Sequence, residues 1–150
     1  MDKKIDPKRF FDKEQKALIL RAITDAELKT SGEVRVHVAS FVKKTAYDDA
    51  VAVFNKLRMY RTKDRNGALL FVTLRDRKLA IIGDAGIHAK VGEHFWDEIC
   101  VSTVKAFSEE RFLDGIVAAV ARIGEQLKMH FPRSKADINE LADDISFDDD

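Results

Sequence analysis

Cysteine is nearly missing from this chain of 150 residues, which holds only Cys100. A single thiol excludes an internal disulfide, and the apolar neighbours of Cys100 indicate a buried structural thiol. No hydrophobic run approaches the roughly 18 residues of a membrane-spanning helix. The charged start MDKKIDPKRFF also has no apolar region typical of a secretory signal. We therefore expect a cytoplasmic protein that does not insert directly into membranes.

The chain carries no excess of charge of either sign, because 26 basic residues balance 26 acidic ones. This balance argues against nucleic acid as a partner. Three signatures that would identify an enzyme class are missing: the phosphate loop GxxxxGK[ST], the nucleophile elbow GxSxG and the zinc motif HExxH. Apolar residues at 45% and charged residues at 35% are typical of a soluble globular domain. Whether this domain is catalytic stays open.

Hydrophobic periodicity predicts the element order helix, strand, helix, strand, strand, helix, helix. The expected ranges are a helix at 12–30, a strand at 33–41 towards the sheet edge, a helix at 45–60, strands at 68–74 and 79–82, and helices at 95–107 and 108–131. The first strand, helix and second strand form a βαβ crossover, and the short turn at 75–78 makes the next pair an antiparallel hairpin. The predicted fold class is α/β, a three-layer α/β/α sandwich with a small mixed sheet.

The composition divides the chain into three segments. Residues 1–9 form a charged leader that we expect to be flexible, and residues 10–132 carry the periodic apolar pattern of the domain. Residues 133–150 form an acidic tail that we expect to be disordered. Its apolar residues allow a second interpretation, a short docking peptide. These residues are Ile138, Leu141, Ile145 and Phe147.

The expected strand directions bring oxygen-bearing side chains to one end of the sheet, which we call the acidic pole. Its members are Glu33, Asp64, Asn66 and Asp84, with Gly67, Gly83 and Gly86 shaping the loops between them. Oxygen ligands without thiols suit a hard cation, so Ca²⁺ or Mg²⁺ is the expected cofactor. His88 and His94 flank the glycine-rich turn and are further candidates for this pole.

The opposite end of the sheet gathers cations, and we call it the basic pole. Its members are Lys43, Lys44, Arg75 and Arg77. They lie beside the capped helix start at Thr45, and cations near the amino end of a helix can hold a phosphate. The weaker prediction here is an anion site, and the alternative is an ordinary solvated loop end.

Two single side chains allow both a structural and a functional interpretation. His37 lies on the polar face of the first strand beside Arg35, which predicts a solvated side chain, although a metal ligand or general base is the alternative. Trp96 lies at helical spacing among apolar residues, which predicts a core position, although a ligand platform is the alternative.

Three segments resemble a known family: SGEVRVHV, then DRNGALLFVTLRDRKLAIIGDAG, then FSEERFLDGIVAAV. They are similar to the TPM domain, named partly for thylakoid-lumen phosphatase-like proteins, and the resemblance covers roughly residues 10 to 130. It implies an α/β/α sandwich, acid phosphatase activity and divalent-cation binding in some members, and roles in the assembly or repair of membrane complexes. Relatives commonly have a G-x-G turn where this chain reads Gly83-Asp84-Ala85-Gly86. The family's glycine-flanked strand ends correspond to Asn66, Gly67, Gly83 and Gly86.

Two functions follow from the residues and the resemblance together. The first is a divalent-cation-binding interaction module with a protein partner, assisting assembly or repair of a membrane-associated complex. The second is a metal-assisted acid phosphatase, in which a cation held by Asp64, Asp84 and Glu33 activates water against a phosphate monoester.

Overall fold

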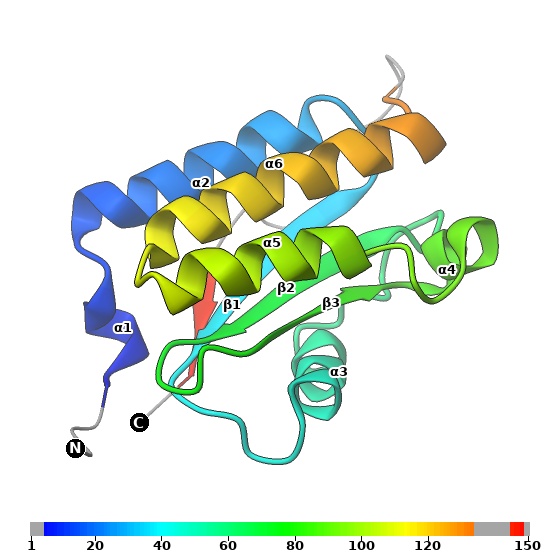
Figure 1. The fold of residues 1–150 in the computed structure, drawn as a ribbon. Helices are drawn as coiled ribbons and strands as arrows, with labels where there is room; N and C mark the ends of the chain where they lie inside the picture. The colour runs from blue at the N-terminus through cyan, green and yellow to red at the C-terminus, as the bar shows by residue number, and fades with distance from the viewer. Residues whose placement is uncertain (1–4, 134–144, 149–150) are drawn as a thin grey trace.

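The computed structural model describes residues 5–133 and 145–148. The helices are α1 (Pro7–Phe10), α2 (Lys13–Glu27), α3 (Ala46–Lys56), α4 (Ala85–Val91), α5 (Asp97–Ser108) and α6 (Phe112–His130). The strands are β1 (Glu33–Ala39), β2 (Gly67–Thr73), β3 (Leu79–Gly83) and β4 (Ile145–Phe147). Helices α2, α5 and α6 cover one face of the sheet and α3 lies against the other (Figure 1). The expected α/β class and three-layer sandwich are confirmed.

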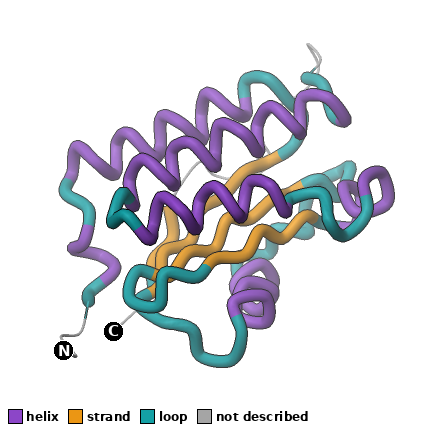
Figure 2. The backbone as a smooth tube through the Cα atoms, in the orientation of Figure 1, coloured by secondary structure: helices purple, strands orange, loops and turns teal. Residues whose placement is uncertain are grey.

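The four strands form one sheet in the order β3-β2-β1-β4. Figure 2 shows them as a single layer between helical segments. β1 and β2 run parallel, as a βαβ crossover requires, and β3 returns antiparallel to β2. β2 is buried along its whole length because it has a strand on each side and helices on both faces. The mixed sheet with its hairpin therefore follows the prediction.

The tail differs from the expectation of disorder at its described end. Ile145–Phe147 form β4, which pairs in parallel with β1, so β1 is an interior strand and not an edge strand. Ile145 is buried in the main core and Phe147 packs against it. Burial of these two side chains favours order locally despite the acidic composition. Residues 134–144 of the predicted tail lie outside the described residues, so the docking-peptide interpretation is untested for Ile138 and Leu141.

Two short helices were not expected. Pro7–Phe10, within the predicted leader, form one turn capped by Asp6, and the Phe10 ring packs edge-on against the rings of Phe11 and Phe112. Residues 1–4 lie outside the described residues. Ala85–Val91 form α4, where the glycines at 83, 86 and 92 had indicated a turn. Asp84 caps this helix and Gly92 ends it, so the glycines mark its boundaries.

The capping pattern at the start of α2 is confirmed. The Asp12 side chain accepts a hydrogen bond from the Gln15 N–H at 2.8 Å, and the Gln15 side chain accepts one from the Asp12 N–H at 2.9 Å. This reciprocal pair satisfies two amides that the helix itself leaves open. α3 ends at Lys56, earlier than the predicted residue 60, because Arg58 adopts a positive φ of 56°.

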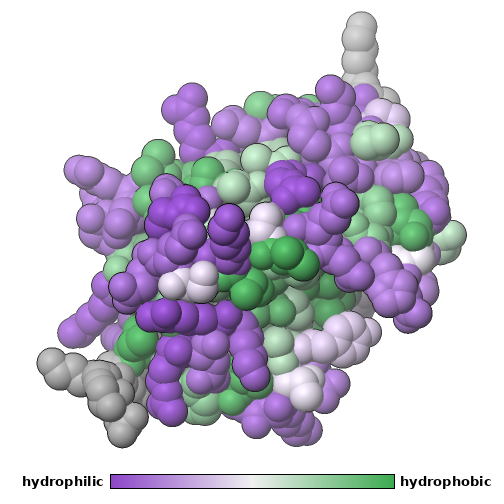
Figure 3. Space-filling model, in the orientation of Figure 1, coloured by the Kyte–Doolittle hydropathy of each residue, from purple (hydrophilic) through white to green (hydrophobic). Residues whose placement is uncertain are grey.

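Hydrophilic side chains cover most of the face seen in Figure 3, with hydrophobic ones gathered near its centre. The largest exposed apolar side chains of the described part are scattered over several elements, for example Leu28 in the loop after α2 and Val101 in α5. Among the residues described, no helix has both the length and the apolar content needed to cross a bilayer.

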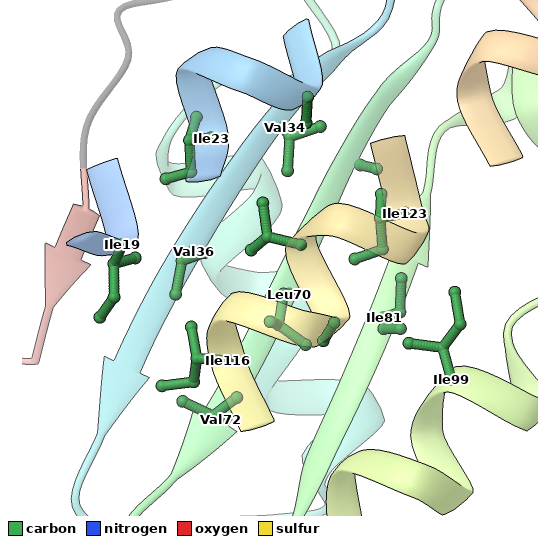
Figure 4. Close-up of a cluster of buried hydrophobic side chains, with 14 of the residues drawn as sticks. Ile19, Ile23, Val34, Val36, Leu70, Val72, Ile81, Ile99, Ile116 and Ile123 are labelled. Carbon is green, nitrogen blue, oxygen red and sulfur yellow. The ribbon is translucent and has the colours of Figure 1, made fainter. Parts of the chain in front are cut away.

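The main core fills the space between the sheet and the three helices on one face (Figure 4). Every second residue of β1 and β2 points into it, as the two-residue period of a strand dictates. The strand residues are Val34, Val36, Val38, Ala68, Leu70 and Val72, and the helices contribute Ile19, Ile23, Ile116 and Ile123. The opposite face packs separately on α3 through Phe54 and Leu69.

Candidate functional site

The register of the sheet brings the acidic pole together. Glu33 pairs with Gly67 across the two parallel strands. The Glu33 N–H donates to the Asn66 carbonyl at 3.3 Å, and the Asp84 N–H donates to the Gly67 carbonyl at 2.9 Å. The three segments that were expected to meet at this end of the sheet therefore do so, and what their side chains contact decides what the pole can bind.

Asp84 is held by three donors. As the cap of α4, its Oδ1 accepts a hydrogen bond from the Ala85 N–H at 2.7 Å. The Arg65 guanidinium donates through Nε to Oδ2 at 2.7 Å and through Nη2 to Oδ1 at 2.9 Å. This hydrogen bonding and the negative charge of Asp84 raise the pKa of Arg65. Asp84 is 6% exposed and Arg65 is 51% exposed, so the arginine closes the pole from the solvent side.

The loop that carries Arg65 rests directly on the first turn of α4. The Gly86 N–H donates to the Arg65 carbonyl at 2.9 Å. A Cβ atom at Gly86 would lie 2.1 Å from the Asp64 carbonyl oxygen, so only glycine fits this approach. Arg65 itself has a positive φ of 50°. The Asp64 side chain is exposed, and in this contact the residue contributes its backbone.

Asn66 and Glu33 lie deeper in the acidic pole and are each 1% exposed. The Asn66 side chain donates through Nδ2 to the Ser31 hydroxyl at 3.2 Å, and its N–H donates to Thr62 Oγ1 at 3.1 Å. Its Oδ1 atom is buried and finds no hydrogen-bond partner within the described residues. A buried amide oxygen of this kind is an acceptor available to a water molecule or a cation.

The side chains of the acidic pole do not, as they stand, fit a divalent cation. Both oxygens of Asp84 are engaged by Arg65, and Asp64 is exposed. Within residues 5–133 and 145–148, no three His, Cys, Asp or Glu side chains are arranged to hold a metal ion. The guanidinium occupies the position where a cation would neutralise Asp84, so a metal could bind there only if Arg65 moved away.

A hollow of about 270 Å³ lies beside the acidic pole. Its lining includes Gly83 at the end of β3, Ile87 and His88 of α4, and His94 and Trp96 in the following loop. Both histidines that were candidates for the pole therefore face this hollow. His94 is 82% exposed and its Nδ1 lies 3.2 Å from Asp97 Oδ2. The hollow combines an indole, imidazoles and aliphatic side chains, a composition suited to binding a partner side chain.

The amides near the basic pole are bound by carboxylates of the same chain. Asp49 Oδ2 accepts from the Lys43 N–H at 2.6 Å, and its Oδ1 accepts from the Lys44 N–H at 3.2 Å. Asp76 accepts from the Val42 N–H at 2.6 Å. These amides precede α3, where Thr45 caps the helix as predicted. The chain's own carboxylates thus lie where a bound phosphate was expected, and the anion site stays a prediction.

The arginines of the basic pole have separate contacts. The Arg75 guanidinium lies 5.5 Å from the Phe41 ring centre, and Arg77 Nη2 lies 3.3 Å from Glu110 Oε1. Side chains spread in this way over an aromatic ring and a carboxylate do not converge on one point. Their arrangement is that of a solvated loop end with local ion pairing.

His37 is not the solvated side chain that its strand position had predicted. It is 6% exposed and stacks on Phe71, with ring centres 5.6 Å apart. Its ring nitrogens contact Ser146 in β4 and Asp148, the residue after β4, which strand periodicity around His37 could not indicate. Trp96, in contrast, is 8% exposed and belongs to the main core, as predicted.

Sequence reasoning missed Arg65 as a member of the acidic pole. The residue lies between Asp64 and Asn66, both of which were identified, and a cation flanked by predicted acidic ligands was the available signal. Counting charges within the pole would have added Arg65 as a cation among three carboxylates, without showing that its partner is Asp84. The group around His37 had no comparable signal, because its members lie 109 and 111 residues apart in the chain.

Comparison with known proteins agrees with this architecture. A family model described as the TPM domain matches residues 4–126. The NMR structure of the BA42 protein from the psychrophilic bacterium Bizionia argentinensis is 37% identical, with a TM-score of 0.86 over 93% of this chain and 97% of that chain. No curated protein matches the chain.

Two more distant solved structures share the fold. The N-terminal domain of a P. gingivalis protein is 14% identical, with a TM-score of 0.64 over 82% of this chain and 80% of that chain. The N-terminal domain of the cg2496 protein from Corynebacterium glutamicum is 13% identical, with a TM-score of 0.62 over 87% of this chain and 82% of that chain. At this identity the likeness concerns the fold alone.

Proposed function

This chain belongs to the TPM domain family, and on that basis we propose that its acidic pole is a divalent-cation-binding interaction module that assists the assembly or repair of a membrane-associated complex. It would act from the cytoplasm by binding a protein partner at the acidic pole and the adjoining hollow. The observation that carries the proposal is the Arg65–Asp84 pair, which commits the pole's most buried aspartate to holding two loops together.

The pair supports binding over catalysis because of what it does to Asp84. A carboxylate that accepts three hydrogen bonds, two of them from a guanidinium, is a poor general base and is not free to ligate a metal. The same contacts hold the loop at residues 64–66 against α4 and keep the rim of the hollow in place. A preorganised surface of this kind loses little conformational entropy when a partner binds.

We propose that divalent cations compete with Arg65 for the carboxylate of Asp84. The arginine is half exposed and can turn into solvent, which would leave Asp84 and the buried Asn66 Oδ1 as oxygen ligands. Binding of Ca²⁺ or Mg²⁺ should then be weak, because the cation must displace an existing ion pair. Its effect would be to reorder the loops at the surface that the partner recognises.

The test is a titration of the full chain with Ca²⁺ and with Mg²⁺, followed by amide NMR shifts. We expect shifts confined to residues 64–67 and 83–93 at millimolar metal, and binding roughly tenfold tighter in Arg65→Gln, which lacks the competing charge. Arg61→Gln, an exposed arginine nearby, is the matched control and should bind as the wild type does. Absence of shifts in all three proteins would remove the cation from the proposal.

The partner is tested by affinity capture from a detergent extract of cell membranes. His94→Ala in the hollow should lose the partner, whereas Lys44→Ala at the opposite pole should retain it. Equal recovery with both variants would place the partner's contact elsewhere. The same samples are assayed with p-nitrophenyl phosphate, since the family resemblance also predicts a metal-assisted phosphatase. Hydrolysis that disappears with chelator and with Asp84→Ala would replace the present proposal.

A further inference from the structure

Strand β4 brings a serine and an aspartate to the two ring nitrogens of one histidine. His37 Nδ1 lies 2.8 Å from Ser146 Oγ, and His37 Nε2 lies 2.7 Å from Asp148 Oδ1. We call these three residues the Ser–His–Asp group. β4 lies beside β1 at the edge of the sheet (Figure 1), on the side of β1 that faces away from β2. Its pairing with β1 starts at Val36, past the pole residue Glu33.

The contacts define where the protons lie. A carboxylate only accepts hydrogen bonds, so the His37–Asp148 contact places a proton on Nε2. In the neutral imidazole the other nitrogen, Nδ1, is then an acceptor, and the Ser146 hydroxyl must donate to it. The Ser146 hydroxyl also lies within donating distance of the Val36 carbonyl, at 3.4 Å, and the contact to His37 Nδ1 is the shorter of the two. The serine is therefore hydrogen-bonded to a base that is oriented by a carboxylate.

The group is held in place by the sheet. Ser146 is the direct register partner of His37, and the Asp148 N–H donates to the Val38 carbonyl at 3.0 Å. The His37 ring stacks on Phe71 with an angle of 7° between the ring planes. Burial of His37 and the fixed strand register leave little freedom for the three side chains to move apart, which is the preorganisation that a nucleophile and its base require.

A pocket of about 460 Å³ opens beside the group. It lies where α3, which packs mainly on β2 and β3, meets the part of the same sheet face that β1 and β4 form. Its lining includes all three members of the group, with apolar walls and two cations. The walls include Phe41, Val53, Leu57 and Phe71, and the cations are Lys43 and Lys56.

We propose that Ser146 is the nucleophile of an esterase site that takes carboxylic esters with a short apolar acyl group. The apolar walls fit the acyl chain, and the pocket exceeds the size of such a group. Lys43 and Lys56 are the pocket's sources of positive charge for the oxyanion that forms during attack. This activity is separate from the proposed interaction at the acidic pole and does not depend on it.

The reaction proceeds in two balanced steps. Ser146 Oγ attacks the ester carbonyl carbon while its proton passes to His37 Nδ1. The bond between that carbon and the leaving oxygen then breaks, and His37 returns the proton to release the alcohol. Water attacks the acyl-serine through the same base, releasing the carboxylic acid and restoring the Ser146 hydroxyl. Asp148 acts as a positioning residue, because it holds the tautomer and faces the imidazolium that forms.

The test uses the full chain with a fluorophosphonate probe and with p-nitrophenyl butyrate. We expect the probe to label Ser146, identified by peptide mass, and ester hydrolysis to fall roughly 100-fold in Ser146→Ala and His37→Gln. Ser108→Ala is the matched control, since Ser108 is exposed at the end of α5 and hydrogen-bonds only within its own helix turn among the described contacts. It should react as the wild type does.

A purely structural role for the group gives a different result. Amide spectra establish that each variant is folded, and hydrogen exchange in β1 and β4 reports whether the strands stay paired. Asp148→Asn should lower the labelling rate and change its pH profile while the strands stay paired. If wild-type Ser146 is not labelled, or if Ser146→Ala hydrolyses the ester at the wild-type rate, the proposal is overturned. The group would then only stabilise the pairing of β4 with β1.

Discussion

At the level of single residues, carboxylates at both ends of the sheet have partners within the chain. Arg65 neutralises Asp84 at the acidic pole, and Asp49 accepts the amides of Lys43 and Lys44 beside the basic pole. Each pole was expected to attract an external ion of the opposite charge. Partners within the chain stabilise these charges without a bound ion. An external ion would therefore have to compete with those partners.

Cys100 is only partly buried, whereas its apolar neighbours in the sequence had predicted a buried thiol. Burial raises the pKa of its thiol, and the neighbouring charge of Asp97 raises it further. The thiol therefore stays protonated at neutral pH and is a weak nucleophile. The prediction of a structural cysteine is consistent with this environment.

Gly86 is the residue for which the structure predicts the largest effect of a single added methyl group. In Gly86→Ala the new Cβ would meet two backbone oxygens, those of Asp64 at 2.1 Å and Arg65 at 2.7 Å. Backbone atoms cannot turn aside as a flexible side chain does. We expect the free energy of unfolding to fall by about 3 kcal/mol, measured by urea denaturation.

Gly92→Ala is the matched control for this prediction. Gly92 has a φ of 83° and no atom near the position of a Cβ, so the substitution strains the backbone without a clash. The ψ of −176° at Gly92 places it in a region that is essentially restricted to glycine, so the substitution should lower the free energy of unfolding by about 2 kcal/mol. An equal loss in both variants would mean that the contact between the 64–65 loop and α4 is not as close as described.

At the level of elements, β4 is the piece whose role differs most from expectation. Its three residues pair with the middle of β1, and the alternation of a strand sends Ile145 into the core and Ser146 to the opposite face. One short strand thus completes the core on one side of the sheet and the Ser–His–Asp group on the other.

Ile145→Ala tests whether β4 is part of the cooperative fold. Ile145 is 6% exposed, so its truncation leaves a cavity, and we expect the free energy of unfolding to fall by about 2 kcal/mol. Leu28→Ala, at a position 63% exposed, should change it by less than about 0.5 kcal/mol. Urea denaturation measures both. Indistinguishable stabilities would show that β4 detaches without cost to the domain.

At the level of the whole molecule, the two faces of the sheet are covered unequally. Three helices enclose the main core on one face, whereas the other face carries α3, which packs mainly on β2 and β3 and contacts β1 at Ala39. The pocket beside His37 results from this asymmetry. The surface as a whole carries equal numbers of acidic and basic residues.

The charge balance predicts how solubility depends on pH. With 26 residues of each sign and 4 histidines, the net charge passes through zero near neutral pH. Repulsion between molecules is then smallest, so solubility should be lowest at about pH 7 and higher at about pH 5 and pH 9. Precipitation by polyethylene glycol measures it. Lys13→Glu with Lys44→Glu should move the minimum to lower pH, and an unmoved minimum would show that charge does not control it.

The acidic pole illustrates how far local patterns reach. The apolar run before Thr73 and the short turn after it predicted the hairpin, and strand direction alone then placed Asn66 near Asp84. What those side chains would contact did not follow, because a carboxylate at a strand end can ligate a metal, or accept a hydrogen bond from a helix amide or an arginine, equally well. Arg65 was selected by the shape of its loop, including a positive φ that sequence reasoning had not indicated.

The sequence by itself determined the four longer helices, the hairpin and the sandwich class, because these depend on interactions between residues close in the chain and on the two- and 3.6-residue periods of burial. The family follows from the sequence as well. Only the tertiary structure decided which distant groups meet. The pairing of Asp148 with His37, 111 residues apart, depends on the register that β4 adopts on β1, and packing of the assembled core sets that register.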